Sequence, residues 1–172
     1  SGKRLYSSVP LALTNAGIPL FTENDYYAGN ALSADFTGQG WHDFLGFPEA
    51  PVFDPETAGA KLAELTHHYD FSFFEYWASD YAGHKQDMPW AVNQLEVLDG
   101  VLKGFIRKSD WQSDLLLITS DHGNMEDLGT RKHTAAHVPL LLFGDKTNRD
   151  AFADVSDLTG IAPAINTLLE IN

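Results

Sequence analysis

The chain has 172 residues, with a hydrophobic fraction of 44% and an aromatic fraction of 12%, which is the composition of a folded globular protein. Its formal net charge of -13 argues against a nucleic-acid partner, because binding to a phosphate backbone depends on clustered Lys and Arg. It contains no cysteine, which excludes disulfides and thiolate metal sites, so any metal must be held by His, Asp or Glu.

The negative charge does not exclude a small phosphorylated substrate, because bound divalent cations can reverse the local charge of a site. No apolar run approaches the roughly 20 residues that a membrane helix needs. We therefore expect no membrane partner, and a cytoplasmic location.

In chain order, the first 52 residues form a loop-rich segment with short elements, since Pro and Gly recur throughout it. A helix is predicted over 55–68, because Asp54 is a suitable N-cap and Pro55 suits the first helical position. The aromatic run 71–77 has the length of a buried strand. The first half of the chain thus leads from loops into a helix and then a strand.

The second half alternates helix and strand. Apolar residues at helical spacing predict a helix over 88–108, and a final helix is expected over 157–169. The short apolar runs 115–118 and 138–143 are typical of strands covered by helices on both faces. This alternation indicates an α/β sheet, and ligands of such sheets collect where strands end and loops begin.

Three groups of Asp and His lie beside these predicted strands. Asp and His four positions apart share one face of a helical turn, and carboxylate with imidazole suits zinc or manganese. One such pair alone is more often a solvated helix face than a ligand pair. Three groups that the sheet would bring together favour metal binding instead. The groups are 80–84 (DYAGH), 121–124 (DHGN) and 133–137 (HTAAH).

These groups carry a resemblance to known enzymes. The segment 119–126 (TSDHGNME) resembles the Asp-His-Gly-Asn-x-Glu segment of the cofactor-independent phosphoglycerate mutases. The segment 133–139 (HTAAHVP) is similar to the His-Thr...Val-Pro segment of those enzymes and of the phosphopentomutases, and 80–84 matches their Asp-x-x-Gly-His. The ending 158–169 is similar to the terminal helix of many members of the alkaline phosphatase superfamily.

The resemblance implies a fold and a division of the chain. The fold would be α/β, an alkaline-phosphatase-like three-layer sandwich with a mostly parallel sheet that is incomplete at the N-terminus. Residues 53–172 would be the C-terminal part of the metal-binding domain. Residues 1–52 would be the end of a cap domain that selects the substrate.

The resemblance also implies a set of metal ligands. Asp80, His84 and His133 would hold one divalent ion, and Asp121 and His122 would belong to the second. The ions would be zinc or manganese. The second site would be incomplete in this chain, so we expect one ion to bind more tightly than the other.

Other residues near these motifs have supporting roles in this interpretation. Asn124, Glu126 and His137 would orient ligands or support the structure around them. Lys85 and Arg131 would hold a phosphate or carboxylate of the substrate through charge-assisted hydrogen bonds. Exposed basic residues usually have no such role, so these two carry the weaker expectation.

The catalytic nucleophile is not identified in the sequence. In the related families a Ser or Thr attacks the phosphoryl group, and an early Asp completes the second metal site; both come from far upstream. Thr37 is the nearest match to such a nucleophile in this chain. The residues that follow it do not resemble a helix N-terminus, so we interpret it as part of a turn. We expect this chain alone to be inactive.

The leading hypothesis is therefore the C-terminal part of a metal-dependent phosphohydrolase or phosphomutase. One alternative is a non-catalytic metal-binding or structural relative, and another is a sulfatase or phosphonate hydrolase of the same superfamily. The expected partner is a small phosphorylated substrate. A homo-oligomer is also possible, because an incomplete sheet exposes strand edges through which copies can exchange segments.

Overall fold

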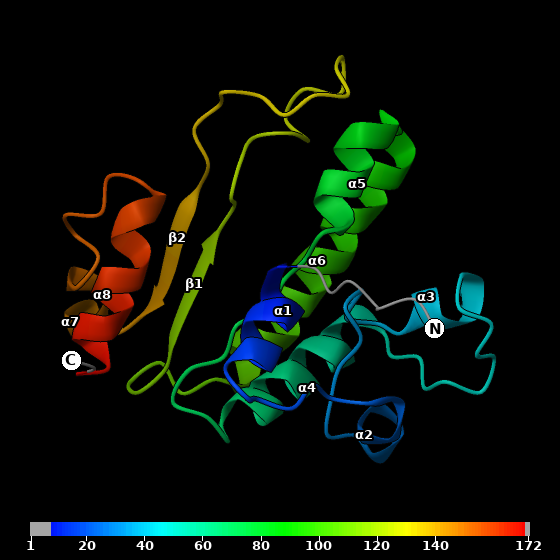
Figure 1. The fold of residues 1–172 in the computed structure, drawn as a ribbon, viewed down its shortest axis with the longest axis horizontal. Coiled ribbons are helices and arrows are strands. Elements are labelled where there is room, and N and C mark those ends of the chain that lie inside the picture. The colour runs from blue at the N-terminus through cyan, green and yellow to red at the C-terminus, as the bar shows by residue number, and fades with distance from the viewer. Residues whose placement is uncertain (1–7, 171–172) are drawn as a thin grey trace.

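The structure is a computed structural model that describes residues 8–170. Its elements, in chain order, are α1 (Ser8–Asn15), α2 (Glu23–Ala28), α3 (Gln39–Asp43), α4 (Pro55–Thr66), α5 (Ala78–Lys85), α6 (Met88–Lys108), β1 (Leu115–Thr119), β2 (Leu140–Gly144), α7 (Lys146–Asp150), the 3-10 helix η1 (Leu158–Gly160) and α8 (Ile161–Leu168). In Figure 1 the two strands stand between α7 and α8 on one side and α4, α5 and α6 on the other.

The two long helices begin at the residues that the sequence predicts. The Asp54 carboxylate accepts a hydrogen bond from the backbone N–H of Thr57 at 3.0 Å, at the start of α4. The Asp87 carboxylate does the same for Trp90 at 3.1 Å, at the start of α6. These side chains satisfy amide groups that have no partner inside the helix. None of the helices that the structure describes is long and apolar enough to cross a membrane.

Helices α4 and α6 cross with their backbones in close contact. A Cβ atom on Gly59 would lie 1.9 Å from the carbonyl oxygen of Val101, and one on Gly104 would lie 1.9 Å from that of Glu56. Ala58 and Val101 are buried at this crossing. Helix α5, and with it the first group of metal-ligand types, packs against α6.

The segment 71–77 is extended, but it is not a strand, so that prediction is wrong. Phe74 and Tyr76 pack towards the core, and the Phe74 ring stacks on Phe36 at a centroid distance of 4.3 Å. Phe71 and Phe73 are exposed on the opposite side. The segment therefore has the alternation of a strand, while no backbone hydrogen bond within the described residues joins it to β1.

The described residues also do not contain the expected mostly parallel sheet. Their sheet has two strands, β1 and β2, which run antiparallel with Leu117 opposite Leu142. A parallel pair needs a long crossover connection, usually a helix. No helix lies between β1 and β2, so the chain returns along β1 in the opposite direction. The α/β composition is as predicted, and the direction of the strands is not.

The N-terminal segment contains short helices joined by loops, as expected. Tyr26 stacks on Trp41 at 4.8 Å, and its hydroxyl donates a hydrogen bond to the carbonyl of Pro51. One detail differs from the prediction, because α3 begins at Gln39, directly after the turn that contains Thr37. The Thr37 hydroxyl accepts a hydrogen bond from the Gln39 backbone N–H at 3.3 Å, so it is engaged within its own turn.

The close crossing of α4 and α6 predicts whether a substitution there raises or lowers the free energy of unfolding. Replacing Gly by Ala inside an open helix usually stabilises a protein by about 0.5–1 kcal/mol. At Gly59 the added methyl group would collide with the α6 backbone, so Gly59→Ala should instead lower the free energy of unfolding by about 1–3 kcal/mol. Urea unfolding followed by circular dichroism measures this change. A gain in stability would show that the helices do not approach each other this closely.

Candidate metal centre

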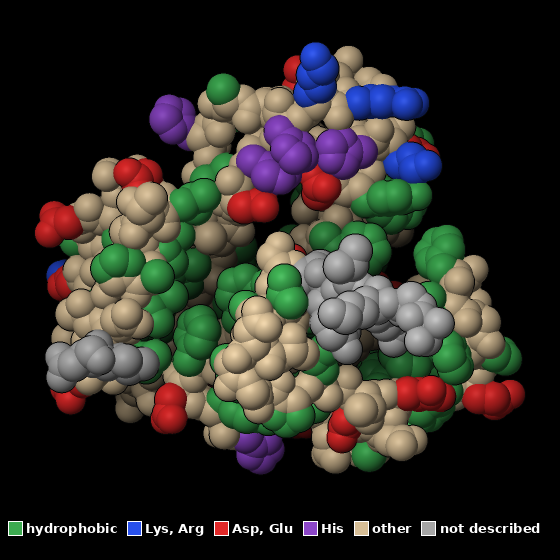
Figure 2. All heavy atoms as spheres, in the orientation of Figure 1, with side chains coloured by type: hydrophobic (Ala, Val, Ile, Leu, Met, Phe, Trp, Pro, Cys, Tyr) green, Lys and Arg blue, Asp and Glu red, His purple; other side chains and the backbone are tan. Residues whose placement is uncertain are grey.

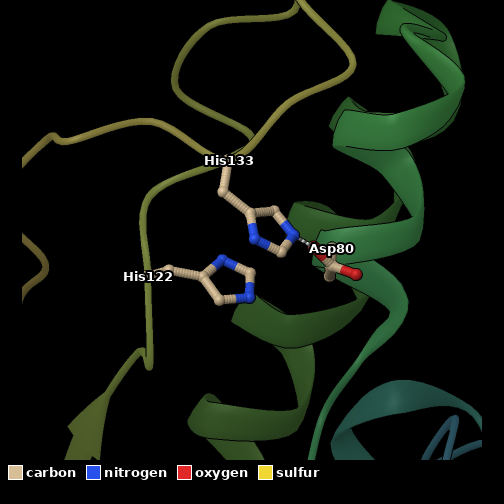
Figure 3. A group of neighbouring side chains, drawn as sticks. All are labelled: Asp80, His122 and His133. Carbon is tan, nitrogen blue, oxygen red and sulfur yellow. Dashed lines mark ion pairs between the residues drawn. The ribbon is translucent and has the colours of Figure 1, made fainter.

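Side chains from three separate parts of the chain converge at one place. Asp80 comes from the first turn of α5, His122 follows β1, and His133 lies in the loop that leads to β2. Figure 3 shows the three side chains pointing toward one another, and their donor atoms lie within 4.8 Å of each other. One carboxylate and two imidazoles thus face a common point.

A fourth side chain, His84, joins this group. Its Nε2 lies 3.4 Å from Oδ2 of Asp80, and Nε2 of His133 lies 3.4 Å from Oδ1 of the same carboxylate. The two Nε2 atoms are 3.3 Å apart. Ligand atoms that bind a tetrahedral ion at about 2.0–2.1 Å lie roughly 3.3–3.4 Å from one another. The two histidine nitrogens have this spacing from each other, and each lies at a similar distance from the Asp80 carboxylate, His84 from Oδ2 and His133 from Oδ1.

The tautomer of His84 also suits a metal ligand. Its Nδ1 lies 2.7 Å from the carbonyl oxygen of Arg131, which can only accept a hydrogen bond. The proton of the neutral ring therefore sits on Nδ1, and the lone pair on Nε2 faces Asp80 and His133. Metal-bound histidines commonly donate their second ring nitrogen in this way, which fixes the ring orientation.

His122 and Asp121 are placed differently from each other. The His122 ring stacks on His133 at a centroid distance of 3.6 Å, and its Nδ1 is buried without a hydrogen-bond partner. Its Nε2 lies 3.5 Å from Oδ1 of Asp121, whose side chain is 84% exposed. A buried nitrogen without a partner is costly, and a metal ion would satisfy it. The division of these residues between two ions stays a prediction.

Asn124 ties the loop after β1 to helix α5. Its side-chain Nδ2 donates to the backbone carbonyl of Asp80 at 3.1 Å and also to the Asp80 carboxylate. The buried amide packs where Gly83 has no side chain, since a Cβ atom there would lie 1.7 Å from Oδ1 of Asn124. Asn124 therefore holds Asp80 in place, and the glycine of the 80–84 motif makes room for it.

Glu126 links the two loops that carry His122 and His133. Its carboxylate accepts hydrogen bonds from the Thr134 hydroxyl and from the backbone N–H of Asn124, the latter at 2.7 Å. The hydrogen bond from Thr134 is the main cause that lowers the pKa of Glu126 below its ordinary value. The backbone N–H of Thr134 also donates to the carbonyl of Gly123 at 2.9 Å. An ionised Glu126 thus holds together the segments around the candidate metal centre.

The remaining predicted residues lie around this centre. His137 is exposed and borders a hollow of about 390 Å³ that Asp121 and His122 also line, so it shares this hollow without belonging to the clustered donors. Lys85 ends α5, with its Nζ 5.2 Å from the centre of the Tyr81 ring. Sequence analysis assigned no role to three other residues that the structure places in supporting contacts. They are Gly83, Gln86 and Thr134.

The α/β fold and the clustered carboxylate and imidazole donors are typical of metal-binding α/β proteins. The family model described as "Metalloenzyme superfamily" matches residues 53–172, so the chain belongs to the metalloenzyme superfamily. This membership implies a divalent metal and an alkaline-phosphatase-like fold.

Three of the similar proteins come from bacteria. A phosphopentomutase of Photorhabdus laumondii is 30% identical over 62% of this chain and 26% of its own length. The 2,3-bisphosphoglycerate-independent phosphoglycerate mutase of Yersinia pestis is 30% identical over 74% of this chain and 27% of its own length. That of Cronobacter sakazakii is 31% identical over 73% and 27%. The chain thus spans about a quarter of these relatives, and no solved structure matches it.

The contact between Asn124 and Asp80 can be tested by metal binding. Asn124→Ala should weaken binding of Zn²⁺ or Mn²⁺ by about 10- to 100-fold, because residues that orient metal ligands have effects of this size. Isothermal titration calorimetry measures the affinity. The matched control is Asn93→Ala, which removes an exposed amide from α6 and should leave the affinity unchanged. Equal affinities for both variants would mean that Asn124 does not position Asp80.

Proposed function

We propose that this chain is the metal-binding part of a phosphoryl-transfer enzyme, a phosphomutase or a phosphohydrolase. The observation that carries the proposal is the convergence of Asp80, His84 and His133, in which each histidine Nε2 lies 3.4 Å from an oxygen of the Asp80 carboxylate and the two Nε2 atoms lie 3.3 Å apart. Membership of the metalloenzyme superfamily supports it, as do the names of the relatives, which are mutases of phosphorylated compounds. The proposed substrate is a small phosphorylated molecule.

In this proposal one ion is held by Asp80, His84 and His133, and the second by Asp121 and His122 together with groups outside this set. When bound, divalent ions of this kind neutralise charge on a phosphoryl group and activate its attacker. The chain's own residues keep the donors in position. The carbonyl of Arg131 holds the ring of His84, and Asn124 holds the carboxylate of Asp80.

The nucleophile is proposed to come from a polypeptide segment outside residues 8–170. Thr37 is the nearest match that the sequence offered, and its hydroxyl is engaged with the Gln39 backbone and with the carboxylate of Asp35 at 3.4 Å. This engagement also keeps open a second candidate function, a metal-binding relative without turnover. The two differ in whether any form of the protein that binds metal transfers a phosphoryl group.

The decisive experiment compares metal content with activity. Metal analysis by mass spectrometry is combined with hydrolysis of an aryl phosphate and with a phosphomutase assay, each before and after chelation. Both this chain and the longest polypeptide encoded by its reading frame are assayed. We expect chelation to abolish activity wherever activity is found. Activity that survives complete removal of the metal would end the proposal, and a metal-loaded but inactive long polypeptide would favour the non-catalytic relative.

A metal titration tests the proposed ligands themselves. His133→Ala should weaken the tighter site by more than about 100-fold, because it removes a ligand rather than a residue that merely orients one. His137→Ala is the matched control, since His137 is exposed outside the clustered donors, and it should change the affinity less than about threefold. The unmodified chain should show one tight and one weak site. Two equally tight sites, or equal effects of both substitutions, would contradict the assignment.

A further inference from the structure

A hollow of about 390 Å³ lies beside the candidate metal centre, where β1 ends and its loop begins. Asp121 and His122 line it, so it is continuous with the proposed ligands. Its volume is within the roughly 300–1,000 Å³ of small-molecule sites, and ligands of α/β sheets collect where strands end. Figure 2 shows the histidines at one end of the molecule, with hydrophobic side chains over the strands and α8 next to them. A molecule held at the metal centre could therefore extend into this hollow.

Two segments supply the apolar walls of the hollow, one leading into β2 and the other leading into α8. Their six apolar residues are half-buried or exposed, so each offers apolar surface to an occupant. Leu158, for example, is 40% exposed. Apolar surface of this kind provides most of the lining of small-molecule sites, and its burial favours binding. The six residues are Val138, Pro139, Leu140, Val155, Leu158 and Ile161.

The wall that leads into α8 is held in place by its own contacts. The Asp157 carboxylate accepts hydrogen bonds from the Thr159 hydroxyl at 2.5 Å and from the Thr159 backbone N–H at 2.8 Å. These two hydrogen bonds lower the pKa of Asp157 below its ordinary value. A Cβ atom on Gly160 would lie 3.3 Å from Cγ1 of Val155, so the start of α8 packs closely on this wall. An occupant would not have to order the wall, which is a cost that weakens binding at flexible sites.

The charges around the hollow disfavour an anionic occupant. Among the described residues that line it there is no Lys or Arg, while Asp121 and Asp157 both belong to the lining. Asp121 is a proposed metal ligand, so the Asp157 carboxylate is the charge that an occupant would meet. Like charges repel, which makes this a poor place for a carboxylate or a phosphate. The part of a substrate that reaches the hollow should therefore be uncharged.

We propose that the hollow binds an uncharged, apolar group of the substrate, while the metal ions take the phosphoryl group. This inference rests on the proposed function and names its substrate class, a phosphate ester of an apolar alcohol. The continuity of the two places supports it, because His122 belongs both to the clustered donors and to the lining. The volume also suits an organic group of small-molecule size.

Two phosphonates of the same charge test this subsite. Phenylphosphonate carries an aromatic ring, and methylphosphonate has a methyl group in its place. Calorimetry on the Zn²⁺- or Mn²⁺-loaded chain should show that phenylphosphonate binds at least about tenfold more tightly, because its ring buries more apolar surface. Leu158→Asn should reduce this preference to less than about threefold and leave the affinity for methylphosphonate unchanged. The control Leu11→Asn removes a similarly exposed leucine from α1 and should keep the preference.

A second variant fills the hollow instead of changing its polarity. Ser156 is exposed and belongs to the lining, so Ser156→Phe should weaken binding of phenylphosphonate by at least about tenfold and leave methylphosphonate unaffected. The melting temperature of each variant shows whether it is folded, and metal analysis shows whether the metal centre is loaded.

Two results would overturn the subsite alone. The metal-loaded chain would bind both phosphonates equally, or folded Leu158→Asn and Ser156→Phe would both keep the full preference, as expected if the ring binds elsewhere or another polypeptide segment fills the hollow. A third result reaches further. If neither phosphonate binds to a fully metal-loaded chain, the proposed function fails together with the subsite.

Discussion

The hydrogen bonds between Asn124 and Asp80, with those of His84 and Gln86, join helix α5 to the connection between β1 and β2. The strands β1 and β2 make few direct contacts with α4, α5 and α6, yet the proposed ligands are divided between these parts. Asp80 and His84 belong to α5, while His122 and His133 belong to the loops of the strands. A metal ion bound by both sets would add to the links that join them. Since metal sites rarely preform in unfolded chains, metal binding and the docking of these parts should be coupled.

The sequence was informative where local chemistry decides the structure. Helix α6 has the predicted bounds because Asp87 caps it and its apolar residues repeat at helical spacing. The segment 71–77 shows where such reasoning fails. Its aromatic residues alternate in burial as in a strand, but a strand also needs a partner, and the partner is a property of the whole fold. For the same reason the mostly parallel sheet that the resemblance implied is not found in the described residues, whose two strands are antiparallel.

Within the candidate site, the sequence identified the candidate ligands but not the residues that hold them in place. The sequence placed Asp80 and His84 four positions apart, and the structure shows both facing one point. It gave no sign that Gly83 leaves space for Asn124, because that contact joins residues far apart in the chain. The sequence also gave no sign of the contacts of Gln86, because nothing in it indicates that this glutamine adopts a left-handed backbone conformation. The residues that position the candidate ligands are therefore identified by contacts between distant parts of the chain, which the motif alone does not show.

The charge of the chain sets a condition on how the proposed anionic substrate would be attracted. A chain with a net charge of -13 repels an anionic substrate at long range. At physiological ionic strength this repulsion is largely screened beyond about 8 Å, so attraction must come from charges at the site itself. In the proposed function, bound cations would supply this attraction, because a divalent ion can be the largest local charge of a site and reverse its sign.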